Sequence, residues 1–289
     1  MKSTASLVIL AAGMGSRFGG DKQIVPLSCL QWPLLRFTLF DAWLAGIRHV
    51  VIITRTGLVS FFERDIFPNF PDVRFDIVCQ DQVEPKRAKP WGTGHAALCA
   101  KSAAQERFFI INADDFYGRK AIAQAVHFLE SKIDGQYGCI GYSLANTLSL
   151  HGAVSRGIIR TDENDHVQSI DEYIQIQKHD DGQIYAVEHR TQQHVVLPND
   201  QPTSLNLFAF DRSVFDVLQT KFEAFLEKQQ ESETAEFFLP SSVTSPDVLQ
   251  HHVMHMIPTQ DHWLGLTYAN DLLEVEQQLN QLIDQGRYH

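Results

Sequence analysis

The chain has 289 residues, of which 44% are hydrophobic and 20% charged, and its net charge at pH 7 is −11. The composition is that of an ordinary globular protein, and the length suits one large domain or one domain with a sizeable annex. The acidic balance argues against nucleic acid or an anionic membrane as the main partner. No apolar run reaches the roughly 20 residues that span a bilayer, and the four cysteines are far apart, with no C-x-x-C pair. We therefore expect a cytoplasmic protein with reduced thiols and no membrane partner.

The first half of the chain alternates strand-like and helix-like segments. Apolar, β-rich runs occupy 6–11, 48–54, 74–80, 107–112 and 137–143, and helical patterns occupy 33–45, 58–67, 94–105 and 119–133. Such alternation predicts an α/β fold with a mostly parallel sheet covered on both faces. Ligands bind such sheets beyond the carboxyl ends of the strands. The segments "AAGMGSRFGGDK" and "NADDFYG", each of which follows a strand, are therefore expected to lie at one edge.

The second half of the chain has a different pattern of predicted strands and helices. "SRGIIRTDENDHVQSIDEY" predicts an antiparallel hairpin around a polar turn. A strand at 204–210, a helix at 212–228, a strand at 247–257 and a C-terminal helix at 268–285 follow. The strand pattern at 247–257 contains "HHVMH", in which His251 and His255 share a face opposite His252, which favours core or surface histidines over a metal site. We expect this half to be an antiparallel β extension of the same domain.

The glycine-rich loop after the first strand fits neither common phosphate loop. Lys22 precedes Gln23, whereas a Walker loop has Ser or Thr there, and Phe18 stands where a dinucleotide-binding loop has its third glycine. The loop still offers backbone N–H groups that glycines can bring close to phosphate. Arg17 adds a planar guanidinium that can bind two phosphate oxygens, and Lys22 adds a point charge. These features suit a triphosphate that loses pyrophosphate.

Two further segments suggest chemistry at the same edge. In "NADDFYG", Asp114 and Asp115 point opposite ways if the segment is extended, so one is expected to face the site. A carboxylate beside a triphosphate is a natural Mg²⁺ ligand, and the other carboxylate can cap the following helix. In "KPWGTGHA", Gly92 and Gly94 mark a helix entry where the backbone can approach a flat ring, although a simple helix start fits equally well.

Together these motifs resemble the sugar-phosphate nucleotidyltransferases, whose signature is L-A-A-G-x-G-[ST]-R followed after a short gap by lysine. The resemblance continues through "SRGII", "SIDEY", "SLNLFAF", "EFFLP" and "WLGLTY" in the expected order. It implies a glycosyltransferase-A/Rossmann-like three-layer α/β/α fold with a mostly parallel mixed sheet. It also implies a single domain over 1–289, with a nucleotide-binding half at 1–150 and an acceptor-binding half at 151–289.

The resemblance also implies roles for individual residues. Arg17 and Lys22 would be the catalytic cations, and Asp114 would hold Mg²⁺. The nucleotide would be bound by Ala12, Gly13, Gly15, Gln80, Gly92 and Thr93, and the acceptor by Gly157, Glu172 and Asn206.

Two positions depart from the family pattern. Tyr173 follows Glu172 where a lysine is common, which leaves the acceptor less well defined. A second metal ligand is expected near the tryptophan motif, but neither Asp261 nor Asp271 is in clear register.

The implied reaction is Mg²⁺-dependent transfer of a nucleoside monophosphate from a nucleoside triphosphate to a sugar 1-phosphate, which gives a nucleotide sugar and pyrophosphate. Two alternatives remain open: a cytidylyltransferase for a polyol or choline-type phosphate, and a non-catalytic nucleotide-binding regulatory homologue. A glycosyltransferase is disfavoured because Phe116 interrupts a D-x-D pattern. The base, the acceptor and the oligomeric state, including a homo-oligomer, are left open.

Overall fold

Four parallel strands form the first part of a central sheet in the computed structural model, which describes residues 2–13, 24–85, 87, 89–131, 134–229, 232–266, 268 and 270–288. They are β1 (Ser6–Leu10), β2 (His49–Thr54), β3 (Arg74–Cys79) and β4 (Arg107–Asn112), in the spatial order β4-β1-β2-β3. Strands β1 and β2 are buried along their whole length, as expected for parallel strands covered on both faces. The predicted strands of the first half are confirmed.

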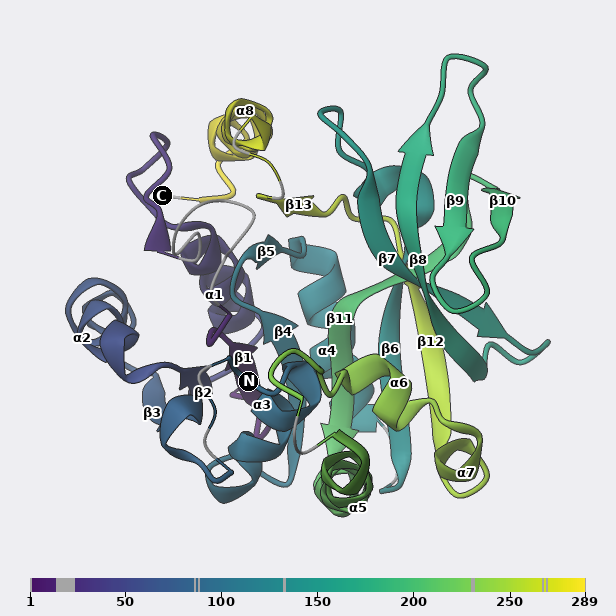
Figure 1. Cartoon of the computed structure of the whole chain (residues 1–289). Coiled ribbons are helices and arrows are strands. Elements are labelled where there is room, and N and C mark those ends of the chain that lie inside the picture. The colour runs from purple at the N-terminus through teal and green to yellow at the C-terminus, as the bar shows by residue number, and fades with distance from the viewer. Residues whose placement is uncertain are drawn as a thin grey trace.

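An antiparallel strand joins this part of the sheet to the rest. Strand β11 (Pro202–Asp211) pairs with β4, with β6 (Gln136–Ser143) and with β7 (Val154–Thr161), and β12 (Val253–Thr259) runs parallel to β6. Beyond β7 lie β8 (Val167–Lys178), β9 (Ile184–Glu188) and β10 (His194–Leu197), all antiparallel (Figure 1). This confirms the predicted antiparallel extension and adds the β9–β10 hairpin. A separate two-stranded pair joins β5 (Asp115–Phe116) to β13 (Leu264–Gly265).

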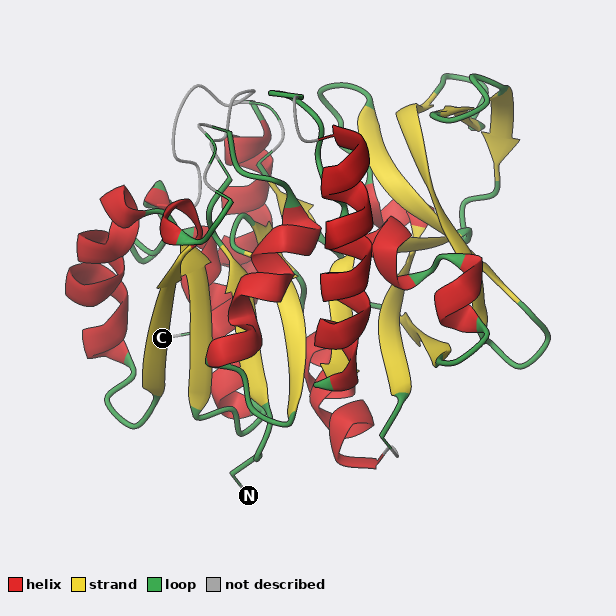
Figure 2. Ribbon diagram, turned by 60° about the horizontal axis from the view of Figure 1, so that its bottom comes forward, coloured by secondary structure: helices red, strands yellow, loops and turns green. Residues whose placement is uncertain are grey.

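Helices cover both faces of the sheet (Figure 2). Leu7 and Ile9 of β1 share one apolar core with α1 (Leu34–Leu44) and α4 (Arg119–Ser131). Val8 and Leu10 face the other way, into a core with α3 (Thr93–Cys99), α5 (Ser213–Gln229) and α6 (Leu239–Val243). The two cores follow from the two-residue period of a strand, and the predicted three-layer α/β/α arrangement is confirmed.

The remaining helical segments lie around this framework. A helical stretch after β2 comprises η2 (Thr56–Leu58), α2 (Val59–Phe61), η3 (Phe62–Ile66) and η4 (Phe67–Asn69). Helix α8 (Asp271–Asp284) packs Val275 and Leu279 into a third apolar cluster. Short segments are η5 (Gln80–Gln82), η6 (Ala100–Ser102), η7 (Leu144–Thr147) and α7 (Pro246–Leu249). Among the described residues, no helix combines the length and the apolar character that a membrane span requires.

The predicted strand at 247–257 is wrong in its first half. Helix α7 begins at Pro246, whose fixed φ suits the first turn of a helix, and β12 begins only at Val253. His251 and His252 therefore precede the strand and do not alternate with His255. The His252 ring stacks on Tyr137 with a centroid distance of 4.7 Å.

Candidate active site

A cavity of about 500 Å³ opens between the two halves of the chain. Its walls come from the ends of β4 and β5, from β7, β8 and β11, from the turn after β9, and from residues at and near α6. Carboxylates contribute much of its polar lining: Asp115, Asp171, Glu172 and Glu188. A concave site of this size with convergent polar groups is a typical small-molecule site.

The predicted acceptor-binding residues come together in this cavity. Gly157, Glu172 and Asn206 all line it, and Gly157 lies opposite Glu172 in the β7–β8 ladder. A Cβ at Gly157 would lie 2.7 Å from the Ile170 side chain, so glycine at this position leaves room for Ile170, which also lines the cavity. Thr93, predicted on the nucleotide side, lines the same cavity.

The backbone of Asn206 is unusual for a strand residue. Its φ of 62° is in the left-handed region, which asparagine adopts more readily than most residues. The β6–β11 register shifts between Ser204 and Phe208, so Asn206 sits in a bulge. Bulges redirect side chains next to active sites, and here the bulged residue borders the cavity.

Close backbone contacts explain the glycines of "KPWGTGHA". The Gly94 N–H donates to the Phe237 carbonyl at 2.8 Å, and the Phe237 N–H donates to the Trp91 carbonyl at 2.6 Å. A Cβ on Gly92, whose φ is +102°, would lie 2.7 Å from the Phe237 carbonyl oxygen, and one on Gly94 would lie 2.6 Å from the Phe237 ring. The Leu239 N–H also donates to Thr93 Oγ1 at 3.0 Å. The glycines thus allow segment 232–239 to dock against this loop.

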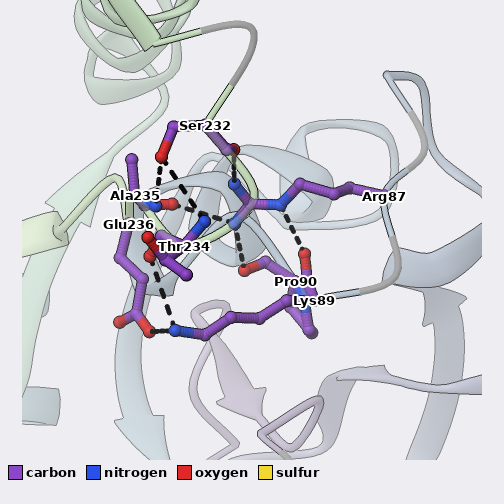
Figure 3. Close-up of polar contacts among 7 residues, drawn as sticks. All are labelled: Arg87, Lys89, Pro90, Ser232, Thr234, Ala235 and Glu236. Atoms are coloured by element: carbon purple, nitrogen blue, oxygen red, sulfur yellow. Dashed lines mark hydrogen bonds and ion pairs between the residues drawn. The ribbon is translucent and has the colours of Figure 1, made fainter.

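Arg87 holds the same two segments together (Figure 3). Its guanidinium lies 3.9 Å from the centre of the Trp91 ring. It donates to four backbone carbonyls, those of Lys89 (2.7 Å), Pro90 (3.0 Å), Ser232 (2.9 Å) and Ala235 (2.9 Å). Lys89 adds an ion pair with Glu236 at 2.7 Å. Sequence reasoning missed this contact, because two of the four carbonyls lie about 150 positions away along the chain.

Gln80, predicted to contact the base, is only 5% exposed. Its amide nitrogen donates to the Gly92 carbonyl at 3.4 Å and to His95 Nδ1 at 3.0 Å. Burial, with a smaller contribution from the Arg87 charge, lowers the pKa of His95 to about 4. His95 is therefore neutral near pH 7, which leaves Nδ1 able to accept the amide proton.

Only one carboxylate of "NADDFYG" is among the described residues that line the cavity, and it is Asp115 rather than Asp114. Asp115 belongs to β5, which pairs with β13, and its Oδ2 accepts hydrogen bonds from Asn112 Nδ2 at 2.9 Å and from the Tyr117 hydroxyl at 3.3 Å. Burial, together with the nearby Asp115 charge, raises the pKa of Tyr117. The role of Asp114 as metal ligand stays a prediction.

The two late aspartates have structural partners. Asp261 Oδ2 accepts the N–H groups of Lys120 (2.7 Å) and Ala121 (3.0 Å) at the start of α4. Asp271 accepts hydrogen bonds from the Ser149 hydroxyl at 2.7 Å and from the Tyr268 N–H at 2.6 Å. Neither is among the cavity residues of the described chain. Within the same described ranges, no group of three or more His, Cys, Asp or Glu side chains could hold a metal ion.

The glycine-rich loop is described only at its start. Arg17, Lys22 and Gly15 lie outside the described residues, whereas Ala12 is buried and Gly13 exposed directly after β1. In the β1–β4 register, Leu10 lies opposite Asn112. The loop therefore leaves the sheet beside "NADDFYG", as predicted from the parallel strand order.

A partly buried cation, Arg156, completes the cavity wall. The Arg156 guanidinium lies 4.3 Å from the centre of the Trp263 ring. Its Nε donates to the Thr147 carbonyl at 3.2 Å, and its Nη1 donates to the Ser155 carbonyl at 2.9 Å. Burial lowers the pKa of Arg156 to about 10, so it is still a cation at neutral pH.

Comparisons with known proteins agree with this architecture. Residues 7–133 match the model of the MobA-like NTP transferase domain. The inositol-1-phosphate CTP transferase from T. maritima is 15% identical, with a TM-score of 0.66 over 97% of this chain and 96% of its own. HddC from Yersinia pseudotuberculosis, complexed with GMP-PN, is 16% identical, with a TM-score of 0.56 over 95% of this chain and 99% of its own.

A third solved structure, UDP-glucose pyrophosphorylase complexed with UDP-glucose, is 15% identical, with a TM-score of 0.60 over 97% of this chain and 99% of its own. No curated protein sequence gave a significant match. At these identities the solved structures establish the fold, and the family model matches the first part of the chain. Residues 7–133 are therefore similar to the MobA-like NTP transferase domain, and the chain shares its fold with solved nucleotidyltransferases.

Proposed function

We propose that this nucleotidyltransferase transfers a nucleoside monophosphate from a nucleoside triphosphate to a sugar 1-phosphate, giving a nucleotide sugar and pyrophosphate. The observation that supports the proposal is the cavity itself, which brings Thr93, for which we propose a role in nucleotide binding, together with Glu172 and Asn206 of the second half. On this basis residues 1–289 act as one domain, with the nucleotide bound by 1–150 and the acceptor by 151–289.

The chemistry of the lining favours an acceptor rich in hydroxyl groups. Carboxylates accept hydrogen bonds, the Asn206 amide both donates and accepts, and sugar hydroxyls can supply both kinds of partner. A choline-type acceptor would instead need open aromatic faces around its quaternary ammonium. Of the two aromatic side chains in the described lining, Phe238 is 44% exposed, whereas the Trp263 ring already stacks with the Arg156 guanidinium. Phe238 alone does not form an aromatic cage around a quaternary ammonium.

A polyol phosphate is the second candidate acceptor. The same hydroxyl chemistry would serve it, and one of the similar solved structures is an inositol-1-phosphate CTP transferase. Sugar and polyol phosphates therefore both belong in the assay, with choline phosphate as the chemically distinct comparison.

In the proposed reaction, an oxygen of the acceptor phosphate attacks the α-phosphorus of the triphosphate. A new P–O bond forms there, and the bond between the α-phosphorus and the oxygen that bridges to the β-phosphate breaks, releasing pyrophosphate. The nucleophile is already an anion and needs no general base. Catalysis then rests on positioning and on charge stabilisation, for which we propose Arg17 and Lys22 on the leaving group.

The donor set near the cavity suits Mg²⁺ with phosphate oxygens as further ligands. Magnesium takes one or two carboxylates in such sites, and Asp114 and Asp115 follow β4 beside the glycine-rich loop. We propose that Asp114 holds the ion and that Asp115, which borders the cavity, assists. When bound, the ion would act as Lewis acid and template for the phosphates.

A pyrophosphate-release screen tests the proposal. Each of ATP, CTP, GTP, TTP and UTP is incubated with Mg²⁺ and with glucose 1-phosphate, inositol 1-phosphate or choline phosphate. We expect release to depend on both the triphosphate and a sugar or polyol phosphate. Release with choline phosphate alone would overturn the acceptor class. Triphosphate binding without turnover on any acceptor would favour the non-catalytic homologue.

A further inference from the structure

The negative charge of the cavity lining should repel the phosphate group of a phosphorylated acceptor. Four carboxylates line it, and a phosphate monoester is itself an anion. Two arginines also line it, Arg156 and Arg190. The Arg156 guanidinium is committed to the carbonyls of Thr147 and Ser155 and to the Trp263 ring.

Arg190 lies in a different environment from Arg156. It is exposed on the turn between β9 and β10. Within the described parts of the chain, its guanidinium has no hydrogen bond or ion pair, yet it borders the cavity. Arginine presents a planar fork that matches phosphate oxygens two at a time. This side chain is therefore available to an anionic ligand.

The turn that carries Arg190 is firmly held. The Gln192 N–H donates to the Glu188 carbonyl at 2.8 Å, and the Glu188 N–H donates to the Gln193 carbonyl at 2.9 Å. The His189 N–H donates to the Glu172 carbonyl of the neighbouring strand at 2.9 Å. The backbone thus fixes the base of the arginine against β8, beside the carboxylates of the acceptor side.

From this arrangement we infer that Arg190 binds the phosphate group of the acceptor, while Glu172 and Glu188 accept hydrogen bonds from its hydroxyls. The inference rests on the proposed function, since it assumes a phosphorylated acceptor in this cavity. On this inference, the β9–β10 hairpin makes the cavity bind phosphorylated compounds in preference to neutral polyhydroxy compounds, because the cavity carboxylates alone would favour the neutral ones.

Binding and kinetics of Arg190→Ala test the inference. Titration calorimetry measures glucose 1-phosphate and inositol 1-phosphate against wild type and variant, with neutral methyl glucoside as the uncharged probe. Loss of a hydrogen-bonded charge pair predicts about ten- to hundredfold weaker binding of the phosphorylated probes, with methyl glucoside unchanged. Arg190→Lys should recover part of the loss because it restores charge without the fork. Lys178→Ala is the matched control, an exposed cation at the end of β8 that is not among the described cavity residues.

The outcomes separate this inference from the proposed function. Turnover with an acceptor KM that is raised in Arg190→Ala, and a triphosphate KM that is not, supports both. Binding that depends on Arg190 without pyrophosphate release overturns the function and leaves the inference standing. Turnover with an unchanged acceptor KM in Arg190→Ala overturns the inference alone. Failure of wild type to bind either phosphorylated probe overturns both the inference and the proposed acceptor class.

Discussion

Replacing His95 by glutamine removes a group whose protonation the fold opposes. His95 is 2% exposed, and burial lowers its pKa from 6.5 to about 4. Because the folded pKa is the lower one, the unfolded chain binds the proton first as the pH falls. The resulting loss of folding stability is absent above pH 6.5 and grows as the pH falls toward 4.

The gap between these two pKa values corresponds to about 3 kcal/mol of unfolding free energy at full effect. At pH 5 the titration is incomplete, and we expect a loss of about 2 kcal/mol relative to pH 7.5. Protonation also turns Nδ1 into a donor, which opposes the Gln80 amide that now donates to it at 3.0 Å.

Urea unfolding of wild type and His95→Gln at pH 7.5, 6.0 and 5.0 measures the effect. The variant can differ from wild type at every pH, so the decisive quantity is the change with pH. We expect wild type to lose about 2 kcal/mol more than the variant between pH 7.5 and 5.0. Equal pH dependence of the two proteins would refute the reasoning, as would an NMR titration of the His95 ring near pH 6.5.

Three further predictions concern the site. Gly92→Ala should lower the free energy of unfolding by at least about 1 kcal/mol because of the positive φ at this position, and should raise the triphosphate KM. Gly57→Ala is the control, because a Cβ there meets nothing within 4 Å. A triphosphate KM that is equal in Gly92→Ala and wild type would contradict the expected effect on nucleotide binding. Arg87→Ala leaves four backbone carbonyls without their donor and should lower the free energy of unfolding, measured in urea, by about 2 kcal/mol or more. A loss of less than about 1 kcal/mol would contradict the role of Arg87 in holding the two segments together. Asp114→Asn and Asp115→Asn should each raise the Mg²⁺ concentration for half-maximal rate about tenfold; an unchanged magnesium titration removes that residue from the metal site.

The layers of the fold could be predicted because each strand carries its own signal. Buried runs such as 48–54 alternate with helical patterns, and parallel pairing follows from that alternation. The β9–β10 hairpin has a weaker signal, since Tyr185 and Val196 are exposed although apolar. The boundary between α7 and β12 was missed because one apolar pattern runs across both elements.

The residues proposed to bind the acceptor could be chosen from the sequence, but their meeting in one cavity could not be predicted from it. Gly157, Glu172 and Asn206 lie on three strands, and only the sheet order brings them to one cavity. The choice between Asp114 and Asp115 depends on the pairing of β5 with β13, about 150 residues away.

The fate of isotopic label tests the central claim most directly. Wild-type protein, Mg²⁺, an accepted sugar or polyol phosphate and its triphosphate are incubated, with ³²P placed either at the α or at the γ position. Attack on the α-phosphorus predicts that the α label enters the nucleotide-linked product and that the γ label leaves as pyrophosphate in equal amount. Transfer of the γ label to the acceptor, or its release as inorganic phosphate, would contradict the account.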